Sequence, residues 1–148
     1  MRLLPALVFG LVAATSMATA QPGGAYRVPY TGHVDRHRGW VRIGTPTPTR
    51  FGTEYFVVGP QAGWFRLLRF DRTWGTVQLR QIRVVTRGRE TRVFNVNIRL
   101  DASHPTTFID LGRPRSIDQL IVTTARFPYG SYSIYGSTSP YIPDVAAR

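Results

Sequence analysis

From Trp40 onward the chain alternates short apolar runs with turn residues. β-Branched and aromatic residues dominate the runs, and no segment of helical length shows an apolar period of 3.6 residues. Such spacing is typical of antiparallel strands in a sandwich or barrel. The strands are predicted at residues 39–44, 54–58, 63–70, 75–86, 91–100, 105–111, 116–125 and 130–136. The pattern therefore predicts an all-β fold: a single antiparallel, jelly-roll-like β-sandwich of about eight strands, without substantial helix in the mature chain.

One hairpin can be predicted in register from its two apolar faces. Pairing Val84 with Phe94 and Ile82 with Val96 puts the apolar residues of both strands on one face. The connecting loop then has three residues, 88–90, since a two-residue loop would mismatch the faces. The polar side chains that this register turns to the opposite face are Gln81, Arg83, Asn95 and Asn97.

The strand over residues 64–70 carries apolar residues on both faces. It is either central and covered on both sides, or it contains a bulge between Leu67 and Leu68. Residues 45–49, with two prolines, are predicted as a stiff extended loop. The predicted core comprises Ile43, Phe56, Leu67, Ile82, Val84, Phe94, Val96, Ile98, Ile109, Leu111, Leu120, Val122 and Ile134.

The N-terminal residues 1–20 have the order of a secretory signal peptide. Arg2 supplies the positive charge, residues 3–14 form the apolar stretch, and residues 18–20 read Ala-Thr-Ala, a small-x-small cleavage site. No later apolar run is long enough to span a bilayer. We therefore expect an exported protein, periplasmic or extracellular. Its segments are predicted as a signal peptide (1–20), a flexible lead-in (21–38), the sandwich (39–136) and a loose tail (137–148).

The basic residues are all arginine. Removing the first 20 of the 148 residues leaves 18 arginines against 8 acids, a net charge of about +10 with neutral histidines. This excess favours anionic partners such as phosphate groups, acidic glycans, nucleic acid or an anionic membrane surface. The favoured alternative is a solubilising surface shaped by codon usage, because the arginines are spread along the chain rather than gathered in one block. The candidate anion-binding residues, around two predicted turns and on one outward face, are Arg83, Arg87, Arg89, Arg92, Arg113 and Arg115.

The best candidate for a metal site is the run from His33 to His37. In an extended segment the side chains of His33, Asp35 and His37 fall on one face, where two imidazoles and a carboxylate converge. The alternative, a solvated polar linker, is favoured because the run lies outside the predicted core. No cofactor is predicted.

Enzymatic chemistry finds little support in the sequence. Cysteine is absent, no G-x-S-x-G motif occurs, and His104 is the one histidine within the predicted sandwich. The acids Asp110 and Asp118 flank a loop rich in arginine, and a paired arginine lowers a carboxyl pKa, the wrong direction for a general acid. We therefore expect a protein that is not an enzyme.

Aromatic and basic residues interleave between Trp64 and Trp74. Exposed, such residues stack on sugar rings or bases; buried, they form a sandwich core with arginines at its rim. The core interpretation is favoured, with Trp74 as the expected exposed exception.

The order of the strand motifs resembles a group of small exported bacterial β-sandwich proteins of unknown function. The resemblance is carried by Trp40-Val41-Arg42-Ile43-Gly44, by the run from Gly63 to Phe70 and by Ile109-Asp110-Leu111-Gly112, and it covers about residues 39–136. The closing Ser133-Ile134-Tyr135-Gly136 is also similar to the last strands of discoidin-type jelly rolls, which bind ligands through loops. Neither resemblance implies a catalytic residue.

The function expected from the sequence is a non-catalytic binding or structural module of the bacterial cell envelope that binds anionic polymers or glycans weakly. The alternatives are a metal-dependent or hydrolytic periplasmic enzyme and an extracellular nucleic-acid binder. The oligomeric state stays open.

Overall fold

The fold is built almost entirely from β-strands. The computed structural model describes residues 26–29, 34–35 and 39–138, and for the first two segments only the backbone. Two 3-10 turns, η1 (Thr49–Phe51) and η2 (Pro60–Ala62), occur in these ranges. Among the described residues, no helix is long and apolar enough to cross a membrane. The strands are β1 (Tyr26–Pro29), β2 (Val34–Asp35), β3 (Trp40–Pro48), β4 (Thr53–Val57), β5 (Trp64–Gly75), β6 (Val77–Thr86), β7 (Thr91–Leu100), β8 (Thr106–Thr124) and β9 (Gly130–Ser137).

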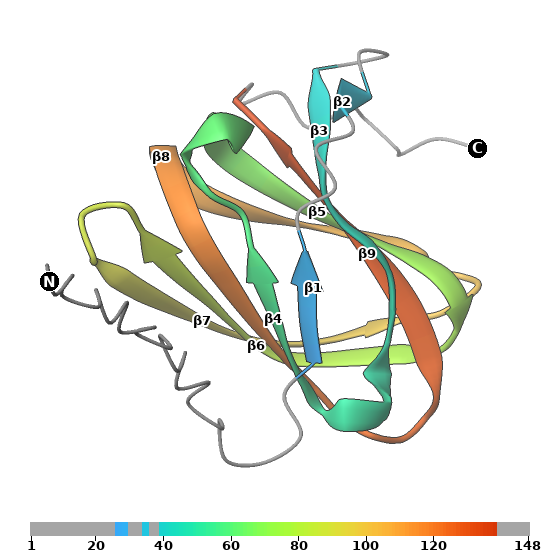
Figure 1. Cartoon of the computed structure of the whole chain (residues 1–148). Helices are drawn as coiled ribbons and strands as arrows, with labels where there is room; N and C mark the ends of the chain where they lie inside the picture. The colour runs from blue at the N-terminus through green and yellow to red at the C-terminus, as the bar shows by residue number, and fades with distance from the viewer. Residues whose placement is uncertain (1–25, 30–33, 36–38, 139–148) are drawn as a thin grey trace, which may run out of the picture.

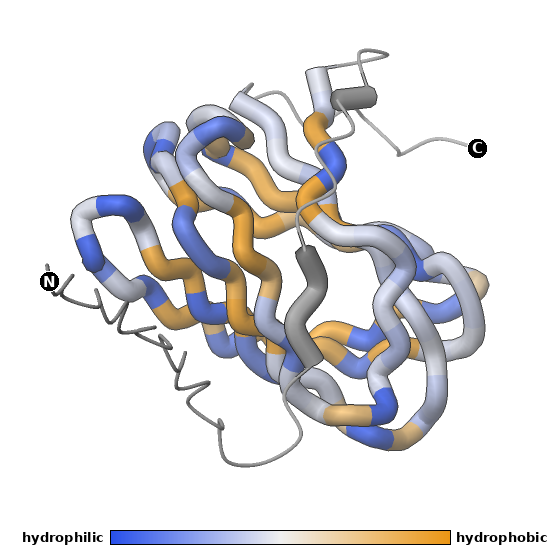
Figure 2. The backbone as a smooth tube through the Cα atoms, in the orientation of Figure 1, coloured by the Kyte–Doolittle hydropathy of each residue, from blue (hydrophilic) through white to orange (hydrophobic). Residues whose placement is uncertain are grey.

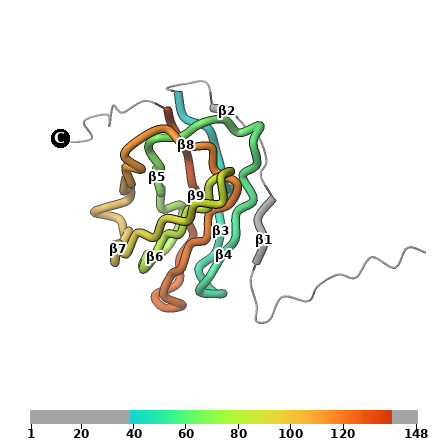
Figure 3. The backbone as a smooth tube through the Cα atoms, turned by 90° about the vertical axis from the view of Figure 1, so that its left-hand side faces the viewer, coloured from blue at the N-terminus to red at the C-terminus, as the bar shows by residue number. Residues whose placement is uncertain are grey.

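The strands form two groups around a shared interior (Figure 1; Figure 3). One group has the order β2-β3-β9-β5-β8, and the other has the order β1-β4-β8-β6-β7. All pairs are antiparallel except β1 with β4. The predicted all-β, sandwich-like fold is confirmed.

Strand β8 belongs to both groups. Residues 106–116 pair with β5, and residues 117–124 lie between β4 and β6. The two strands predicted at 105–111 and 116–125 are therefore one 19-residue strand, and the prediction of a separating loop is wrong. The sequence signals near residues 112–115 mark a bulge within the strand, described with the site below.

The core lies between the two groups, and hydrophobic residues follow their facing sides (Figure 2). Ten of the thirteen predicted core residues are buried. Leu67 is one of them, although it lies outside the main cluster. The buried residues that the prediction left out include Phe65, Leu68, Phe70, Leu79 and Tyr132.

Strand β5 is central, with β8 on one side and β9 on the other. This confirms the first of the two alternatives for residues 64–70. The irregularity against β8 falls between Phe65 and Leu67, not between Leu67 and Leu68. The predicted loop over residues 45–49 is likewise corrected, because β3 continues through Pro48 beside β9.

The β6–β7 hairpin has a different register from the predicted one. Ile82 pairs with Phe94, and Val84 pairs with Arg92, so the strands are displaced by two residues. The displacement keeps the apolar faces together, which is why periodicity could not detect it. It lengthens the loop to residues 87–90, and Arg89 takes a left-handed conformation there (φ 60°).

Strand β7 lies at the edge of its group and pairs only with β6 among the described strands. Phe94, Val96 and Ile98 pack against the core cluster but are only partly buried. Their assignment to the full core is thus wrong, because an edge strand is covered on fewer sides than a central one.

The sheet also extends into the predicted lead-in. β1 pairs with β4, and β2 pairs with β3, where no strand was expected. The predicted signal peptide and residues 139–148 of the predicted tail lie outside the described residues.

Burial predicts unequal costs for two core truncations. Phe56 is fully buried and lies 6.2 Å from the ring of Tyr132, whereas Phe94 is partly exposed. We expect Phe56→Ala to lower the free energy of unfolding by about 3–5 kcal/mol. Phe94→Ala should cost about 1–2 kcal/mol because less apolar area is lost. Urea denaturation measures both; equal costs would contradict the assigned edge position of β7.

Candidate functional site: an arginine-lined hollow

A wide bulge in β8 forms the first wall of the site. Phe65 pairs with Arg115 and Leu67 with Asp110, so residues 111–114 of β8 stand opposite a single residue of β5. Gly112 occupies the left-handed region (φ +81°), which glycine enters without steric cost. Its N–H donates to Asp110 Oδ1 at 2.7 Å. The bulge carries Arg113 and Pro114 outward, both exposed.

The β6–β7 turn forms the second wall and is fastened to β8. Thr86 donates from its backbone N–H to the Glu90 carbonyl oxygen at 2.9 Å, which closes the turn. The Arg87 N–H donates to the Ser116 carbonyl oxygen at 3.1 Å. In Figure 1 the turn, the bend of β8 and the start of β5 lie on the same upper-left side of the molecule. The two arginine-bearing segments therefore meet.

Between these walls lies a hollow of about 360 Å³, called here the arginine hollow. It is lined by Trp64, Thr86, Arg87, Gly88, Arg113, Pro114, Arg115 and Ser116. Trp64 is the first residue of β5, and 61% of its surface is exposed. The hollow thus combines guanidinium groups with the apolar surfaces of an indole and a proline ring.

The charge of the hollow is only partly balanced. Arg115 is 8% exposed, and its Nη1 donates to Glu90 Oε2 at 2.6 Å. Its Nε is buried and donates to no partner among the described residues. The hydrogen bond from Arg115, together with the charges of Arg115, Arg113 and Arg92, lowers the pKa of Glu90. Of the three arginines in the lining, Arg115 is therefore paired with a carboxylate, whereas Arg87 and Arg113 are exposed and have no ion pair among the described residues.

The six predicted arginines occupy four kinds of position. Arg87, Arg113 and Arg115 line the hollow. Arg89 lies in the same turn, exposed but outside the lining. Arg92 is partly buried and donates to the Leu111 carbonyl oxygen at 2.8 Å, so it fastens β7 to β8. The lining does not include Arg83, which is exposed on β6.

Trp64 is the residue that sequence reasoning missed. The sequence favoured a buried position for it, and the predicted exception was Trp74, which is indeed exposed. The overlooked signal was the turn before it: η2 ends at Gly63, which has a positive φ of 97°. This turn places Trp64 at the rim of the core, although a turn alone does not decide exposure: Trp40 follows Gly39, which also has a positive φ, and is buried.

The predicted metal ligands fall largely outside the described part of the chain. His33 and His37 lie outside the described residues, and only the backbone of Asp35 is described, in β2. Within the described part of the chain, no three histidine or acidic side chains are grouped as metal ligands would be.

One buried acid lies in the core, away from the hollow. Glu54 on β4 is fully buried, and Tyr132 Oη donates to its Oε2 at 3.1 Å. Burial raises the pKa of Glu54 from about 4.5 to about 7, against a smaller lowering by the hydrogen bond from Tyr132. Burial and the neighbouring Glu54 also raise the pKa of Tyr132. This pair was not predicted from the sequence.

Comparison with models of known protein families, with curated proteins and with solved structures finds no match to this chain. The resemblance to small exported β-sandwich proteins therefore stays a prediction.

The ion pair within the hollow leads to a prediction for Glu90→Gln. The substitution removes the carboxylate that competes for Arg115, so retention on heparin should require a higher salt concentration for elution. Asp101→Asn is the matched control, because Asp101 lies in the β7–β8 loop, paired with Arg99 at 3.4 Å. Equal gains in the two variants would show that net charge alone is responsible.

Glu54 predicts a pH dependence of stability. Because the folded protein holds this proton more tightly than the unfolded chain, the free energy of unfolding should fall as the pH rises from about 4.5 to about 7. The loss attributable to Glu54 is roughly 3 kcal/mol. Glu54→Gln should remove this slope, because an amide does not titrate. The amide oxygen still accepts the hydrogen bond from Tyr132, so the local structure should be kept. Urea titrations at several pH values compare the two proteins; identical slopes would contradict the assignment.

Proposed function

We propose that this protein is an exported, non-catalytic binding module of the cell envelope that binds anionic polymers through the arginine hollow. The observation that carries the proposal is the convergence of Arg87 and Arg113, 26 residues apart in sequence, on one hollow. The net positive charge of the chain supports attraction of a polyanion from a distance. The ligand class is an acidic glycan: its charged groups pair with the guanidinium groups, and Trp64 contacts the uncharged part of a sugar ring.

Two features limit the affinity. The hollow is open, and its two free arginines are on the surface, where salt screens their attraction. Glu90 already engages Arg115. Binding of an anionic polymer to a single arginine hollow is therefore weak, and it depends strongly on ionic strength.

Heparin chromatography tests the proposal with a double variant, Arg87→Gln/Arg113→Gln. The variant should elute at lower salt than the wild type, and the dependence of log Kd on log salt should become shallower by about two. Stability should hardly change, because both side chains are exposed.

The matched control is Arg80→Gln/Arg83→Gln, two exposed arginines of β6 outside the hollow with the same change in net charge. It should elute close to the wild type. If both variants lose retention equally, or if the wild type is not retained at about 0.15 M salt, the arginines act only as a solubilising surface. Tighter retention on single-stranded DNA than on heparin would contradict the assignment to acidic glycans.

A further inference from the structure

A second surface, distant from the arginine hollow along β5 and β6, gathers exposed aromatic residues. Trp74 is 64% exposed, Phe127 67% and Tyr129 53%. They make up half of the large hydrophobic side chains that are exposed in the described part of the chain, and all three are aromatic. We call these three residues the aromatic end. Trp64 and Trp74 lie at opposite ends of β5, ten residues apart.

Backbone contacts hold the aromatic end together. Trp74 pairs with Ser131 across β5 and β9, two residues beyond Tyr129. The Thr76 N–H donates to the Tyr129 carbonyl oxygen at 3.0 Å. Gly130 allows this approach, since a Cβ there would stand 2.5 Å from the Thr76 carbonyl oxygen. The rings of Phe127 and Tyr129 lie 4.4 Å apart. The backbone segments that carry Trp74 and Tyr129 are therefore held side by side, and the Phe127 ring packs on that of Tyr129.

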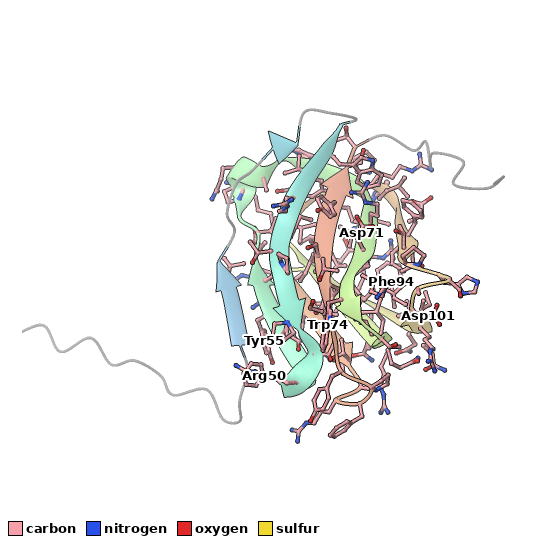
Figure 4. The ribbon with its side chains drawn as sticks, turned by 90° about the vertical axis from the view of Figure 1, so that its right-hand side faces the viewer. Arg50, Tyr55, Asp71, Trp74, Phe94 and Asp101 are labelled. Carbon is pink, nitrogen blue, oxygen red and sulfur yellow. The ribbon has the colours of Figure 1, made fainter. Side chains whose placement is uncertain are left out.

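Arginines surround the aromatic end. The β8–β9 loop and the β3–β4 turn lie side by side at the bottom of Figures 1 and 3, and the Gly130 N–H donates to Thr49 Oγ1 at 3.3 Å. Arg80 and Arg126, both exposed, line a polar hollow of about 390 Å³ next to this turn. Arg50 is exposed and stacks on Phe51 at 4.6 Å. In Figure 4, Arg50 and Trp74 both lie in the lower half of the molecule.

The charge of this surface is of one sign. The segments 49–52, 73–76 and 125–130 contain no acidic residue. Asp101, which follows Leu100 opposite Val77, is already engaged by Arg99 and by the N–H groups of Ser103 and His104. Hydrophobic and hydrophilic residues alternate along the two lower turns in Figure 2.

We propose that the aromatic end, with Arg50, Arg80 and Arg126, docks on a bilayer surface that carries anionic head groups. Tryptophan and tyrosine favour the level of the head groups, where an apolar ring and a polar edge are both satisfied. Arginines beside them pair with lipid phosphates, each adding attraction to an anionic surface. A polyanion bound by charge alone would use the arginines but would leave three aromatic side chains without a role; a glycan that stacked on the rings would instead reveal itself as heparin retention lost with the aromatic side chains. The bilayer accounts for both halves of the surface.

Vesicle binding tests the proposal on the chain as the cell processes it, with its N-terminus checked by intact mass. The protein should sediment with phosphatidylcholine vesicles that contain phosphatidylglycerol, and much less with phosphatidylcholine alone. Arg50→Gln/Arg80→Gln/Arg126→Gln should weaken binding to anionic vesicles about a hundredfold at low salt. The matched control, Arg87→Gln/Arg89→Gln/Arg113→Gln, removes three exposed arginines at the arginine hollow. A larger loss in the control would overturn the proposal.

Tryptophan fluorescence locates the contact. The sequence has three tryptophans, and Trp40 is buried, so Trp64 and Trp74 form a matched exposed pair. In Trp64→Phe, which keeps Trp74, vesicle binding should shift the emission to the blue, and brominated lipids should quench it. In Trp74→Phe, which keeps Trp64, they should not. The reverse pattern, or quenching of neither, would contradict docking through the aromatic end.

A triple variant separates this proposal from the proposed function. Trp74→Ala/Phe127→Ala/Tyr129→Ala should lose vesicle binding at least tenfold and keep the heparin retention of the wild type. All three side chains are exposed, so the variant should fold, which urea denaturation checks. Intact vesicle binding in the triple variant would overturn membrane docking alone, and loss of heparin retention together with vesicle binding would show that the two surfaces are not independent.

Discussion

The rest of the structure depends on the requirement that one strand, β8, pairs with both groups of strands. Residues 106–116 take their hydrogen-bonding partners from β5, and residues 117–124 take theirs from β4 and β6. Within the part of β8 that pairs with β5, a bulge interrupts the ladder between Asp110 and Arg115; residues 112–114 are exposed there, whereas Leu111 stays buried. Gly112 supplies the left-handed conformation, and Pro114, which has no N–H, removes one donor from the ladder. The bulge thus exposes residues 112–114 within one strand, just before β8 changes partners.

This bulge explains why charge collects at that place. Arg113 is on the bulge and Arg115 directly after it, while the hydrogen bond from Arg87 N–H to the Ser116 carbonyl oxygen draws the next hairpin turn alongside. Arg92 links β7 to β8 next to them by donating a hydrogen bond to the Leu111 carbonyl oxygen. At the other end of β5 a close contact between two loops produces the aromatic end. The same scaffold therefore presents two chemically different surfaces about ten residues of strand apart.

Periodicity predicted the strands well because each apolar face needs a partner face; β7, for example, has the predicted bounds. It could not detect a displacement of two residues in the β6–β7 register, since this keeps every face unchanged. Periodicity also could not tell that Phe56 is fully buried and Phe94 only partly buried, because edge and central positions depend on strand order. Sequence reasoning gathered Arg87, Arg113 and Arg115 as candidates, but their convergence and the exposure of Trp64 follow from tertiary pairing. The burial of Glu54, a residue type that usually faces solvent, left no periodic signal at all.

The most direct test of the arginine hollow is an NMR titration of the protein with a short heparin oligosaccharide. Binding at the site built by the β8 bulge predicts the largest amide shifts in residues 86–90 and at Gly112, Arg113, Arg115 and Ser116, together with a shift of the Trp64 indole N–H. The amides of the aromatic end should move little. Shifts spread evenly over all exposed arginines, or concentrated at residues 125–130, would contradict the assignment of polyanion binding to the arginine hollow.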